Sequence, residues 1–389
     1  MQSGLLARGA LVAAALCLGA TVHASAAQGL EGVPHLDHIG VLVLENESFS
    51  STWGASSPAT YLNSLVPGGA FADMYYGTGH VSLDNYIAMT SGQGWQPSTG
   101  SDCASQNLFQ CSQIVSTPSS TNIADQVEGA SGTWKGYMDS APSTCFHGDA
   151  SATATPPDPY QGDSAAAPAG NYADRHDPFV YYSDILSNQT RCDAHVVPYT
   201  QLTTDIGGNT LPNFFFITPD TCHDGHDSPC AAGSPVPSCG ARNAAAGGLV
   251  SADCWLAASL PSIVTYLTAH NGVLLITFDE GATSDTSGCC TGGPGGAAGF
   301  GGRVGLLALG AGVATGTVTH HSYDHASLLR TVEDALGIST YLGNAATATP
   351  MADLFTQPGT NAPEVPLVVA IPMVGGAALM AARRRTRRA

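Results

Sequence analysis

The chain has 389 residues and is 43% hydrophobic, which is enough to bury the core of one large domain or two ordinary ones. Its formal net charge is −18, and between residues 27 and 364 six basic residues face all 30 acidic ones. Nucleic acid is a poor partner for so acidic a surface, and none is expected. An anionic substrate must therefore be held by a metal ion, by histidines or by backbone N–H groups.

Both ends of the chain carry patterns typical of export. Arg8, an apolar run over residues 10–22 and the sequence Ala24-Ser25-Ala26 predict a signal peptide over residues 1–26. Residues 365–382 form an apolar run that is followed by five arginines within residues 383–389. This pattern predicts a transmembrane anchor with a basic cytoplasmic tail, with a cell-wall sorting signal as the alternative.

These boundaries leave one exported domain over residues 27–358 and a linker over residues 359–364. We expect a monomer that is secreted or held on the extracellular side of the cell membrane by its anchor. Ten cysteines lie between residues 103 and 290, and an even number favours disulfides in an oxidising compartment. A zinc cluster is the alternative, but the chain lacks paired C-x-x-C spacings.

Apolar patterns in the exported part alternate between strands and helices. Strands are predicted at residues 38–44, 71–75, 134–138, 213–218, 273–278 and 303–309, and helices at residues 61–65, from about 84, 122–127, 255–270 and 325–336. Segments rich in Gly, Pro and Cys predict disulfide-rich loop insertions at residues 93–171 and 228–253. The alternation predicts an α/β fold whose mostly parallel sheet has helices on both faces.

The rest of the chain is organised around the segment from Gly79 to Gly92. Ser82 lies at the entrance of a predicted helix, where unpaired N–H groups and the positive end of the helix dipole favour an anion. Asn85 follows three residues later, within reach of the same anion. A serine that only caps the helix and an asparagine on the surface would give the same pattern.

Polar clusters follow the predicted strands at the edge where active sites of such sheets form. They are Glu45-Asn46, the Ser82 segment, His223 to Asp227, Asp279-Glu280 and His325, which opens a helix. Carboxylate, amide and hydroxyl oxygens suit a hard or borderline divalent cation, and imidazoles extend the choice to zinc or iron. We therefore predict a metal site that lowers the pKa of the Ser82 hydroxyl and holds a phosphoryl oxygen, although any one of these residues alone is more often a cap or a solvated charge.

The ordered motifs resemble those of a known family. They are Glu45-Asn46-x-Ser-Phe, His80-x-Ser82-x-x-Asn85-Tyr86, Arg175-His176-x-Pro-Phe, His223-Asp-x-His226-Asp227, Thr-Phe-Asp279-Glu280 and His325-x-Ser-x-Leu-x-Thr-x-Glu. This set is similar to the bacterial phosphoesterase family, which includes secreted acid phosphatases and phospholipases C and belongs to the alkaline-phosphatase-like superfamily. The resemblance runs from about residue 38 to residue 336 and is poor in the cysteine-rich insertions.

The resemblance implies a three-layer α/β/α sandwich and a phosphate ester substrate. It implies one divalent metal ion, allows a second, and makes Ser82 a nucleophile that is transiently phosphorylated while Asn85 holds a non-bridging oxygen. The implied metal ligands are Glu45, Asn46, Ser82, Asp279 and Glu280, the other catalytic residues are His80, His226 and His325, and the substrate-binding residues are His176, His223 and Asp227. Asp84 stands where relatives usually have proline, and it adds a carboxylate beside the nucleophile.

Three functions are compatible with these observations. The first is a metal-dependent phosphomonoesterase of the acid phosphatase type that acts outside the cell. The second is a phospholipase C-like phosphodiesterase that acts on lipid head groups, which the predicted membrane anchor favours. The third is a surface binding protein that keeps the fold without catalysis.

Overall fold

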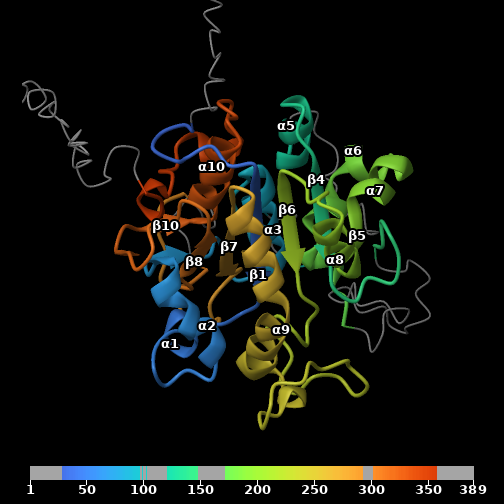
Figure 1. Ribbon diagram of the computed structural model, residues 1–389, viewed down its shortest axis with the longest axis vertical. Helices are drawn as coiled ribbons and strands as arrows, with labels where there is room; N and C mark the ends of the chain where they lie inside the picture. Colours follow the sequence, from blue (N-terminus) through green and yellow to red (C-terminus); the bar gives the residue numbers. More distant parts are fainter. Residues whose placement is uncertain are drawn as a thin grey trace, which may run out of the picture. The chain divides into compact units, whose positions relative to one another are not determined.

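A computed structural model describes residues 29–96, 99, 102, 121–147, 171–291 and 301–356, which all belong to the compact unit Met1–Gln357. Its centre is an eight-stranded sheet with the strand order β5-β4-β6-β1-β7-β8-β2-β9. Figure 1 labels the six strands from β5 to β8 of this order. The strands are β1 (His38–Leu44), β2 (Ala70–Ala72), β4 (Trp134–Met138), β5 (Val196–Pro198), β6 (Phe214–Thr218), β7 (Gly272–Phe278), β8 (Leu306–Gly310) and β9 (Val318–Thr319). The predicted signal peptide, linker, anchor and tail lie outside the described residues.

The predicted mostly parallel sheet is confirmed. β5, β4, β6, β1 and β7 are all parallel neighbours, and the three central strands are continuous apolar runs because helices cover both of their faces. β8 differs, because it runs antiparallel to both β7 and β2. An antiparallel neighbour needs no crossover helix, so the chain between β7 and β8 can return without the helical pattern that a parallel connection requires.

Helices complete the α/β/α arrangement. They are α1 (Phe49–Thr52), α2 (Thr60–Leu65), α3 (Ser82–Ser91), α5 (Ile123–Gly129), α6 (Ser183–Leu186), α7 (Gln189–His195), α8 (Thr200–Gly207), α9 (Gly248–Ala269) and α10 (His325–Ala335). α9 packs against β7 and β8 and also contacts α2, whereas α3 and α10 pack against each other. A second, two-stranded parallel sheet joins β3 (Tyr75–Tyr76) to β10 (Tyr323–Asp324), which leads directly into α10.

α9 is the one helix of the described residues that is long and apolar enough to cross a membrane. Half of its apolar window is buried, and its contacts with β7 and β8 explain this composition as that of a core helix. It begins at Gly248, seven residues before the predicted start, because the insertion ends earlier than its cysteine and glycine content indicates.

Four disulfides hold the described loops and helices. They join Cys145 to Cys192, Cys222 to Cys230, Cys239 to Cys254 and Cys289 to Cys290. Disulfides are therefore present as predicted, with a connectivity that the sequence does not determine. Cys103 and Cys111 lie outside the described residues.

Candidate active site

The carboxyl ends of β1 and β7 bring two polar pairs together. Leu44 and Phe278 are opposite each other in the parallel ladder, so the residues that follow them meet at one edge of the sheet. The backbone N–H of Asn46 donates to Asp279 Oδ1 over 3.2 Å. Asn46 has a φ of +48°, a left-handed conformation that asparagine tolerates better than most residues. The chain thus turns sharply after β1 and keeps both residues against β7.

Ser82 contacts the first of these acids. Its hydroxyl donates to Glu45 Oε2 over 3.0 Å, and both side chains are buried. Ser82 is the first residue of α3, the N-cap is Val81, and the serine side chain makes no capping bond. The alternative that Ser82 is merely an N-cap therefore does not hold. Its hydroxyl is aimed at a carboxylate that follows the central strand.

The side chain of Asn46 lies against the same carboxylates. With its nitrogen turned toward them, the amide lies 2.8 Å from Glu45 Oε2 and 3.3 Å from Asp279 Oδ1. Turned the other way, it places its oxygen among carboxylate oxygens. An all-oxygen cluster of this kind is unfavourable unless a cation lies between the atoms. Glu45, Asn46, Ser82 and Asp279 are therefore brought together as the sequence analysis expects of metal ligands.

Asn85 and Glu280 adjoin this group, although Asn85 has a different setting from the one expected. Asn85 Nδ2 donates to Glu280 Oε2 over 3.1 Å, and its Oδ1 accepts from the N–H groups of Thr78 and Gly79 over 2.6 and 3.2 Å. The two ends of the amide are thus occupied by the protein. Asn85 shapes the loop before α3 and orients Glu280, rather than presenting an unoccupied donor to phosphate.

Burial makes this cluster electrostatically costly. Desolvation raises the pKa of Glu45 and of Asp279 well above the ordinary range, and the neighbouring carboxylates Asp279 and Glu280, respectively, raise them further. Burial and the charges of Glu45 and Asp84 raise the pKa of Glu280 to about 10. A cation in their midst would restore the ionised forms.

Asp84, the departure from the family pattern, is fully buried beside Gly79. A Cβ added at Gly79 would lie 2.3 Å from Asp84 Oδ2, so the carboxyl fits only because residue 79 is glycine. Among the described residues neither Asp84 oxygen has a hydrogen-bond partner. Burial, aided by Asp102, raises the pKa of Asp84 well above its usual value. The neutral form is therefore favoured, and Asp84 adds less negative charge beside Ser82 than its sequence position implies.

His325 and His80 support the backbone around the site. Both ring nitrogens of His325 are engaged, Nε2 with the carbonyl oxygen of Asp279 at 2.6 Å and Nδ1 with the Tyr75 hydroxyl at 2.8 Å. Burial lowers the pKa of His325 to about 4, so its imidazole is neutral. His80 Nε2 lies 2.9 Å from the carbonyl oxygen of Asp285. His325 thus fixes Asp279, and a catalytic role for it, which the resemblance implies, stays a prediction.

His176 lies between two buried acids. Its Nε2 is 3.4 Å from Glu45 Oε1 and its Nδ1 is 3.5 Å from Asp224 Oδ2. Burial lowers the pKa of His176, which keeps a lone pair on the neutral ring for a ligand. Glu45, His176 and Asp224 can each offer one atom within 4.8 Å of the others. His176 was predicted to line the pocket, whereas Asp224 was not, although its position between two motif histidines was an available indication.

The pKa of His226 is shifted in the opposite direction to that of His176. Its Nδ1 bonds to Asp227 Oδ1 at 3.0 Å, and its ring lies 6.3 Å from that of His176. The hydrogen bond with Asp227 raises the pKa of His226 and outweighs the opposing effect of burial. Asp227 also accepts from Thr221 Oγ1 over 2.9 Å. Of the histidines near Glu45, His226 is therefore the one best suited to carry a proton, with Asp227 as its partner.

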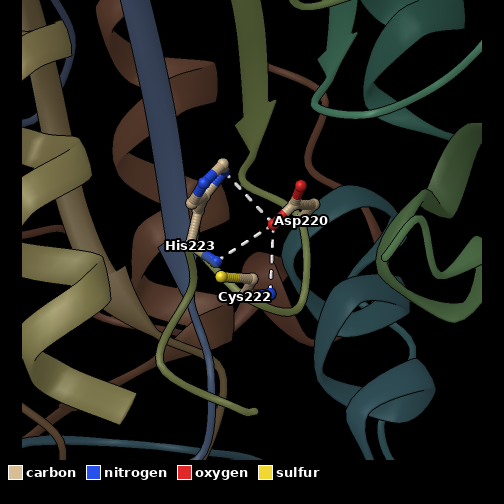
Figure 2. A group of neighbouring side chains, drawn as sticks. All are labelled: Asp220, Cys222 and His223. Atoms are coloured by element: carbon tan, nitrogen blue, oxygen red, sulfur yellow. Dashed lines mark hydrogen bonds and ion pairs between the residues drawn. The ribbon is translucent and has the colours of Figure 1, made fainter. Parts of the chain in front are cut away.

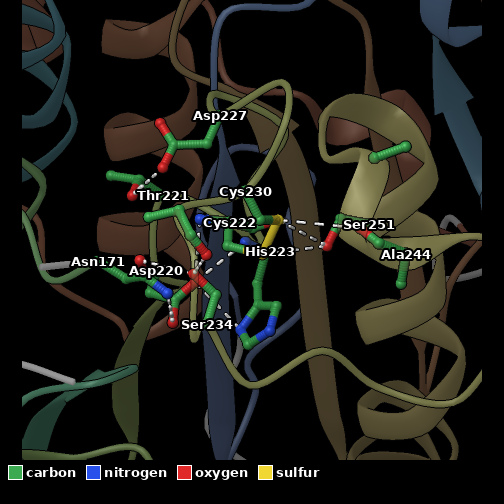
Figure 3. The surroundings of a disulfide bond; sticks show 12 residues. Asn171, Asp220, Thr221, Cys222, His223, Asp227, Cys230, Ser234, Ala244 and Ser251 are labelled. Atoms are coloured by element: carbon green, nitrogen blue, oxygen red, sulfur yellow. Dashed lines mark hydrogen bonds and ion pairs between the residues drawn. A yellow bond between two sulfur atoms is a disulfide. The ribbon is translucent and has the colours of Figure 1, made fainter. Parts of the chain in front are cut away.

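His223 belongs to a separate cluster at the end of β6. Figure 2 shows it with Asp220 and Cys222, a group with the residue types of a metal site. Cys222 is bonded to Cys230, however, so it offers no thiolate (Figure 3). His223 Nδ1 bonds to Asp139 at 2.7 Å and Nε2 to the carbonyl oxygen of Pro235 at 2.6 Å. With both nitrogens occupied, His223 fixes the 220–235 loop and is not positioned to bind substrate.

An apolar cavity lies away from these residues. It has a volume of about 620 Å³ and is lined by residues of α2 and α9 together with Leu309. Leu309 pairs with Leu274 near the start of β7, whereas Asp279 follows the end of that strand. The convergence of polar side chains, rather than this apolar cavity, therefore locates the candidate site.

A serine hydroxyl held against buried acids at the carboxyl edge of an α/β sheet defines a class, that of enzymes able to use an activated hydroxyl nucleophile. Comparison with known protein families then identifies one family. The Phosphoesterase family matches residues 55–237 and 247–339, more than half of the chain. The chain belongs to this family and is a phosphoric ester hydrolase. The matched range includes Ser82 and Asp279 but begins after Glu45 and Asn46.

Several curated relatives are similar over different lengths. A phosphatidylinositol-3-phosphatase of Mycobacterium tuberculosis is 23% identical over 346 residues, which are 88% of this chain and 92% of the relative. An acid phosphatase of Aspergillus fumigatus is 24% identical over 57% of this chain and 41% of its own length. A probable acid phosphatase of Kluyveromyces lactis is 24% identical over 48% of this chain and 38% of its own length. The match thus spans about two fifths of the two fungal relatives.

Solved structures are also similar to this chain, at low sequence identity. A protein in the alkaline phosphatase superfamily from Vibrio parahaemolyticus is 13% identical, with a TM-score of 0.49, over 80% of this chain and 68% of its own. A phosphonate monoester hydrolase from Silicibacter pomeroyi is 12% identical, with a TM-score of 0.46, over 84% of this chain and 78% of its own. Because both TM-scores are below 0.5, the description of the fold rests on the sheet topology alone.

Proposed function

We propose that this protein is an exported, divalent-metal-dependent phosphomonoesterase that works through a phosphoserine at Ser82. The observation that carries the proposal is the 3.0 Å hydrogen bond from Ser82 Oγ to Glu45 within a cluster of buried acids. A serine in such a setting needs a nearby acceptor for its proton and a positive charge for the phosphoryl group. Glu45 is such a proton acceptor, and the buried acids are suited to bind a cation that supplies the positive charge.

The buried groups fit a divalent cation. Asp279 Oδ2, Asp224 Oδ2 and His176 Nε2 are buried without hydrogen-bond partners among the described residues. Unsatisfied acceptors of this kind cost free energy unless a ligand binds them. Glu45, Asn46, Ser82, Asp279 and Glu280 are the proposed ligands of the first ion. When bound, a divalent cation would lower the pKa of the serine hydroxyl and neutralise charge on the phosphoryl oxygens.

A second ion has a candidate place on the other side of Glu45. His176 and Asp224 lie within ligand distance of one another and of Glu45, and all three are buried. Oxygen and imidazole ligands together suit zinc, iron or manganese better than magnesium. The identity of the metal is open to direct measurement.

The chain's own groups divide the proton transfers between them. As Ser82 Oγ forms its bond to phosphorus, its proton passes toward Glu45 Oε2, which already accepts its hydrogen bond. The bond from phosphorus to the leaving oxygen breaks, and His226, kept protonated by Asp227, supplies a proton to that oxygen. In the second half, the neutral His226 takes a proton from the attacking water, whose oxygen bonds to phosphorus as the bond to Ser82 Oγ breaks. Glu45 returns its proton to Ser82 Oγ, phosphate leaves, and both groups are back in their starting states.

A phosphomonoester is the proposed substrate class, because the similar fungal proteins and the Mycobacterium tuberculosis protein are all named as phosphatases. The acidic surface contributes few cationic side chains for a second, bulky anionic group. A phospholipase C-like diesterase and a binding protein without activity remain as outcomes of the experiment below. We also propose the domain boundaries, the export and the membrane anchor given in the sequence analysis, which cell fractionation with and without residues 365–389 would test.

The decisive experiment compares Ser82→Ala with a matched serine on the same helix. Ser91 is also buried, and its hydroxyl donates to the backbone carbonyl of Ile87 over 2.8 Å, away from the acids. Ser82→Ala should abolish phosphate release from an aryl phosphate and prevent phosphoserine formation, whereas Ser91→Ala should stay active. Unchanged turnover in Ser82→Ala would refute the proposal. Faster cleavage of phosphatidylcholine than of a phosphomonoester would identify the diesterase instead.

A further inference from the structure

We propose that Tyr86 is the positioning residue of this site, holding Glu45 through its hydroxyl and His176 through its ring. The inference rests on the proposed function, because it concerns how that site keeps its shape. Tyr86 belongs to a quoted motif but had no role assigned from the sequence. It is fully buried, so its hydroxyl needs a partner inside the protein.

The hydroxyl of Tyr86 and that of Ser82 hold one carboxylate between them. The two residues are four apart on α3 and therefore share one face of the helix. Tyr86 donates to Glu45 Oε1 over 2.5 Å, and Ser82 donates to Glu45 Oε2 over 3.0 Å. One helix face thus fixes both oxygens of the acid that follows β1, and hydrogen bonds to an ionised carboxylate are the stronger kind.

The ring of Tyr86 also makes contacts that hold it in place. It stacks on the His176 imidazole with a centroid distance of 5.3 Å and an interplanar angle of 9°, and it also contacts Phe216 of β6 at 6.0 Å. His176 Nε2 faces the same Glu45 oxygen to which Tyr86 donates. Tyr86 therefore touches both a proposed ligand of the first ion and a proposed ligand of the second.

The chemistry of the site shows why a second donor to Glu45 matters. When Ser82 Oγ bonds to phosphorus it gives up its proton, so it can no longer donate to Glu45 Oε2. Glu45 then carries this proton on Oε2, and the bond from Tyr86 to Oε1 is the remaining hydroxyl contact that orients its carboxyl group. Tyr86 thus preserves the geometry of the proposed metal ligand through the covalent step.

The test measures Mn²⁺ affinity of the purified protein in the absence of substrate, by the loss of the electron paramagnetic resonance signal of free Mn²⁺. Tyr86→Phe keeps the ring and removes the hydroxyl. Removing a hydrogen-bond partner of a metal ligand typically weakens metal binding about 10- to 100-fold, and we expect this loss together with a lower kcat and a smaller change in KM. Wild-type Mn²⁺ affinity in Tyr86→Phe would overturn the inference.

Tyr182→Phe is the matched control. Tyr182 is also fully buried, and its hydroxyl is 2.7 Å from Thr90 Oγ1, on the same helix but two turns beyond Ser82. This variant also loses a buried phenol contact to α3, so it reports the general cost of such a loss. Its Mn²⁺ affinity should remain within about twofold of wild type. Equal weakening of Mn²⁺ binding in Tyr86→Phe and Tyr182→Phe would show that Tyr86 acts only through helix stability and would overturn the proposal.

A double-mutant cycle separates positioning from general destabilisation. In a Glu45→Gln background the carboxylate that Tyr86 orients is absent, so adding Tyr86→Phe should change Mn²⁺ affinity little. If Tyr86→Phe lowers Mn²⁺ affinity as much in the Glu45→Gln background as in the wild-type protein, positioning through Glu45 would be refuted. If wild-type protein binds no divalent cation, the proposed metal dependence fails separately. Tyr86 is then judged by kcat alone, and an unchanged kcat in Tyr86→Phe overturns the inference.

Discussion

Asn85 Nδ2 donates to Glu280 Oε2 over 3.1 Å, so the helix that carries Ser82 is tied to the end of β7. The same amide accepts two backbone N–H groups from the loop before α3 and also donates to the carbonyl oxygens of Gly79 and Val81. One buried side chain therefore closes the loop and orients an acid of the site. This arrangement makes the role of Asn85 testable.

Asn85→Ala should destabilise the protein by about 3 kcal/mol, because it leaves two buried backbone N–H groups and the Glu280 carboxylate without their partner. Chemical denaturation measures this change. Activity should fall with it, through a lower kcat. A variant with wild-type stability and a raised KM would instead support the direct phosphate contact that the family resemblance implies.

The sequence was sufficient for the parts of the fold that depend on local pattern. β1, β6 and β7 are continuous apolar runs because both of their faces are covered, and α10 begins at its Asp324 cap, whose side chain accepts from the N–H of Ser327. The meeting of Glu45 with Asp279 was predictable as well. Both follow parallel strands, and the carboxyl ends of parallel strands share one edge.

The sequence was insufficient where partners are distant along the chain. Both nitrogens of His223 bond to Asp139 and Pro235, a pairing set by a disulfide-held loop that no periodicity describes. His325 was implied to be catalytic, and its contacts with Tyr75 and the carbonyl of Asp279 could not be read from the sequence. A histidine's role depends on what surrounds each nitrogen, and that is a property of the tertiary structure.

Removal of divalent cations should make stability depend on pH. In the metal-free protein burial raises the pKa of Glu45, Asp279 and Glu280, so the folded state retains protons that the unfolded chain releases above about pH 4.5. Stability therefore falls as pH rises from there toward the raised folded values. Thermal melts with a chelator should show a lower Tm at pH 7.5 than at pH 5.5.

Added Mn²⁺ should raise the Tm more at pH 7.5 than at pH 5.5, because it binds the ionised carboxylates. Glu280→Gln is the control, since it removes one titrating acid while keeping an amide of similar size, and its pH slope with chelator should be shallower. A pH-independent Tm with chelator, or the same Mn²⁺ effect at both pH values, would contradict this prediction.

His223→Ala should lower stability by about 1–3 kcal/mol and leave the KM for an aryl phosphate unchanged. The reason is that His223 connects the loop held by the Cys222 disulfide to Asp139. His195→Ala is a useful control, because His195, like His223, bonds to a backbone carbonyl: His195 Nδ1 bonds to that of Trp134 and His223 Nε2 to that of Pro235. A raised KM at wild-type stability in His223→Ala would restore this residue as a substrate ligand.

His226 should determine the alkaline limit of activity. The hydrogen bond with Asp227 raises the pKa of His226 above 6.5, so the proton-donating form is present below that raised pKa and is lost as pH rises through it. Stability also decreases as pH rises through this pKa, because the protonated ring is favoured in the folded state. Asp227→Asn removes the main cause of the shift, so the alkaline limb of kcat should move to lower pH.

Replacing His226 itself should separate substrates by their leaving groups. A general acid contributes about 10²- to 10⁴-fold when the leaving oxygen needs a proton, so His226→Gln should slow an alkyl phosphate by that factor. An aryl phosphate with an acidic phenol needs little protonation and should be slowed far less. His320→Gln, at an exposed surface histidine, should leave both rates unchanged. Equal slowing of the two substrates by His226→Gln would show that His226 binds the phosphoryl group instead of protonating the leaving oxygen.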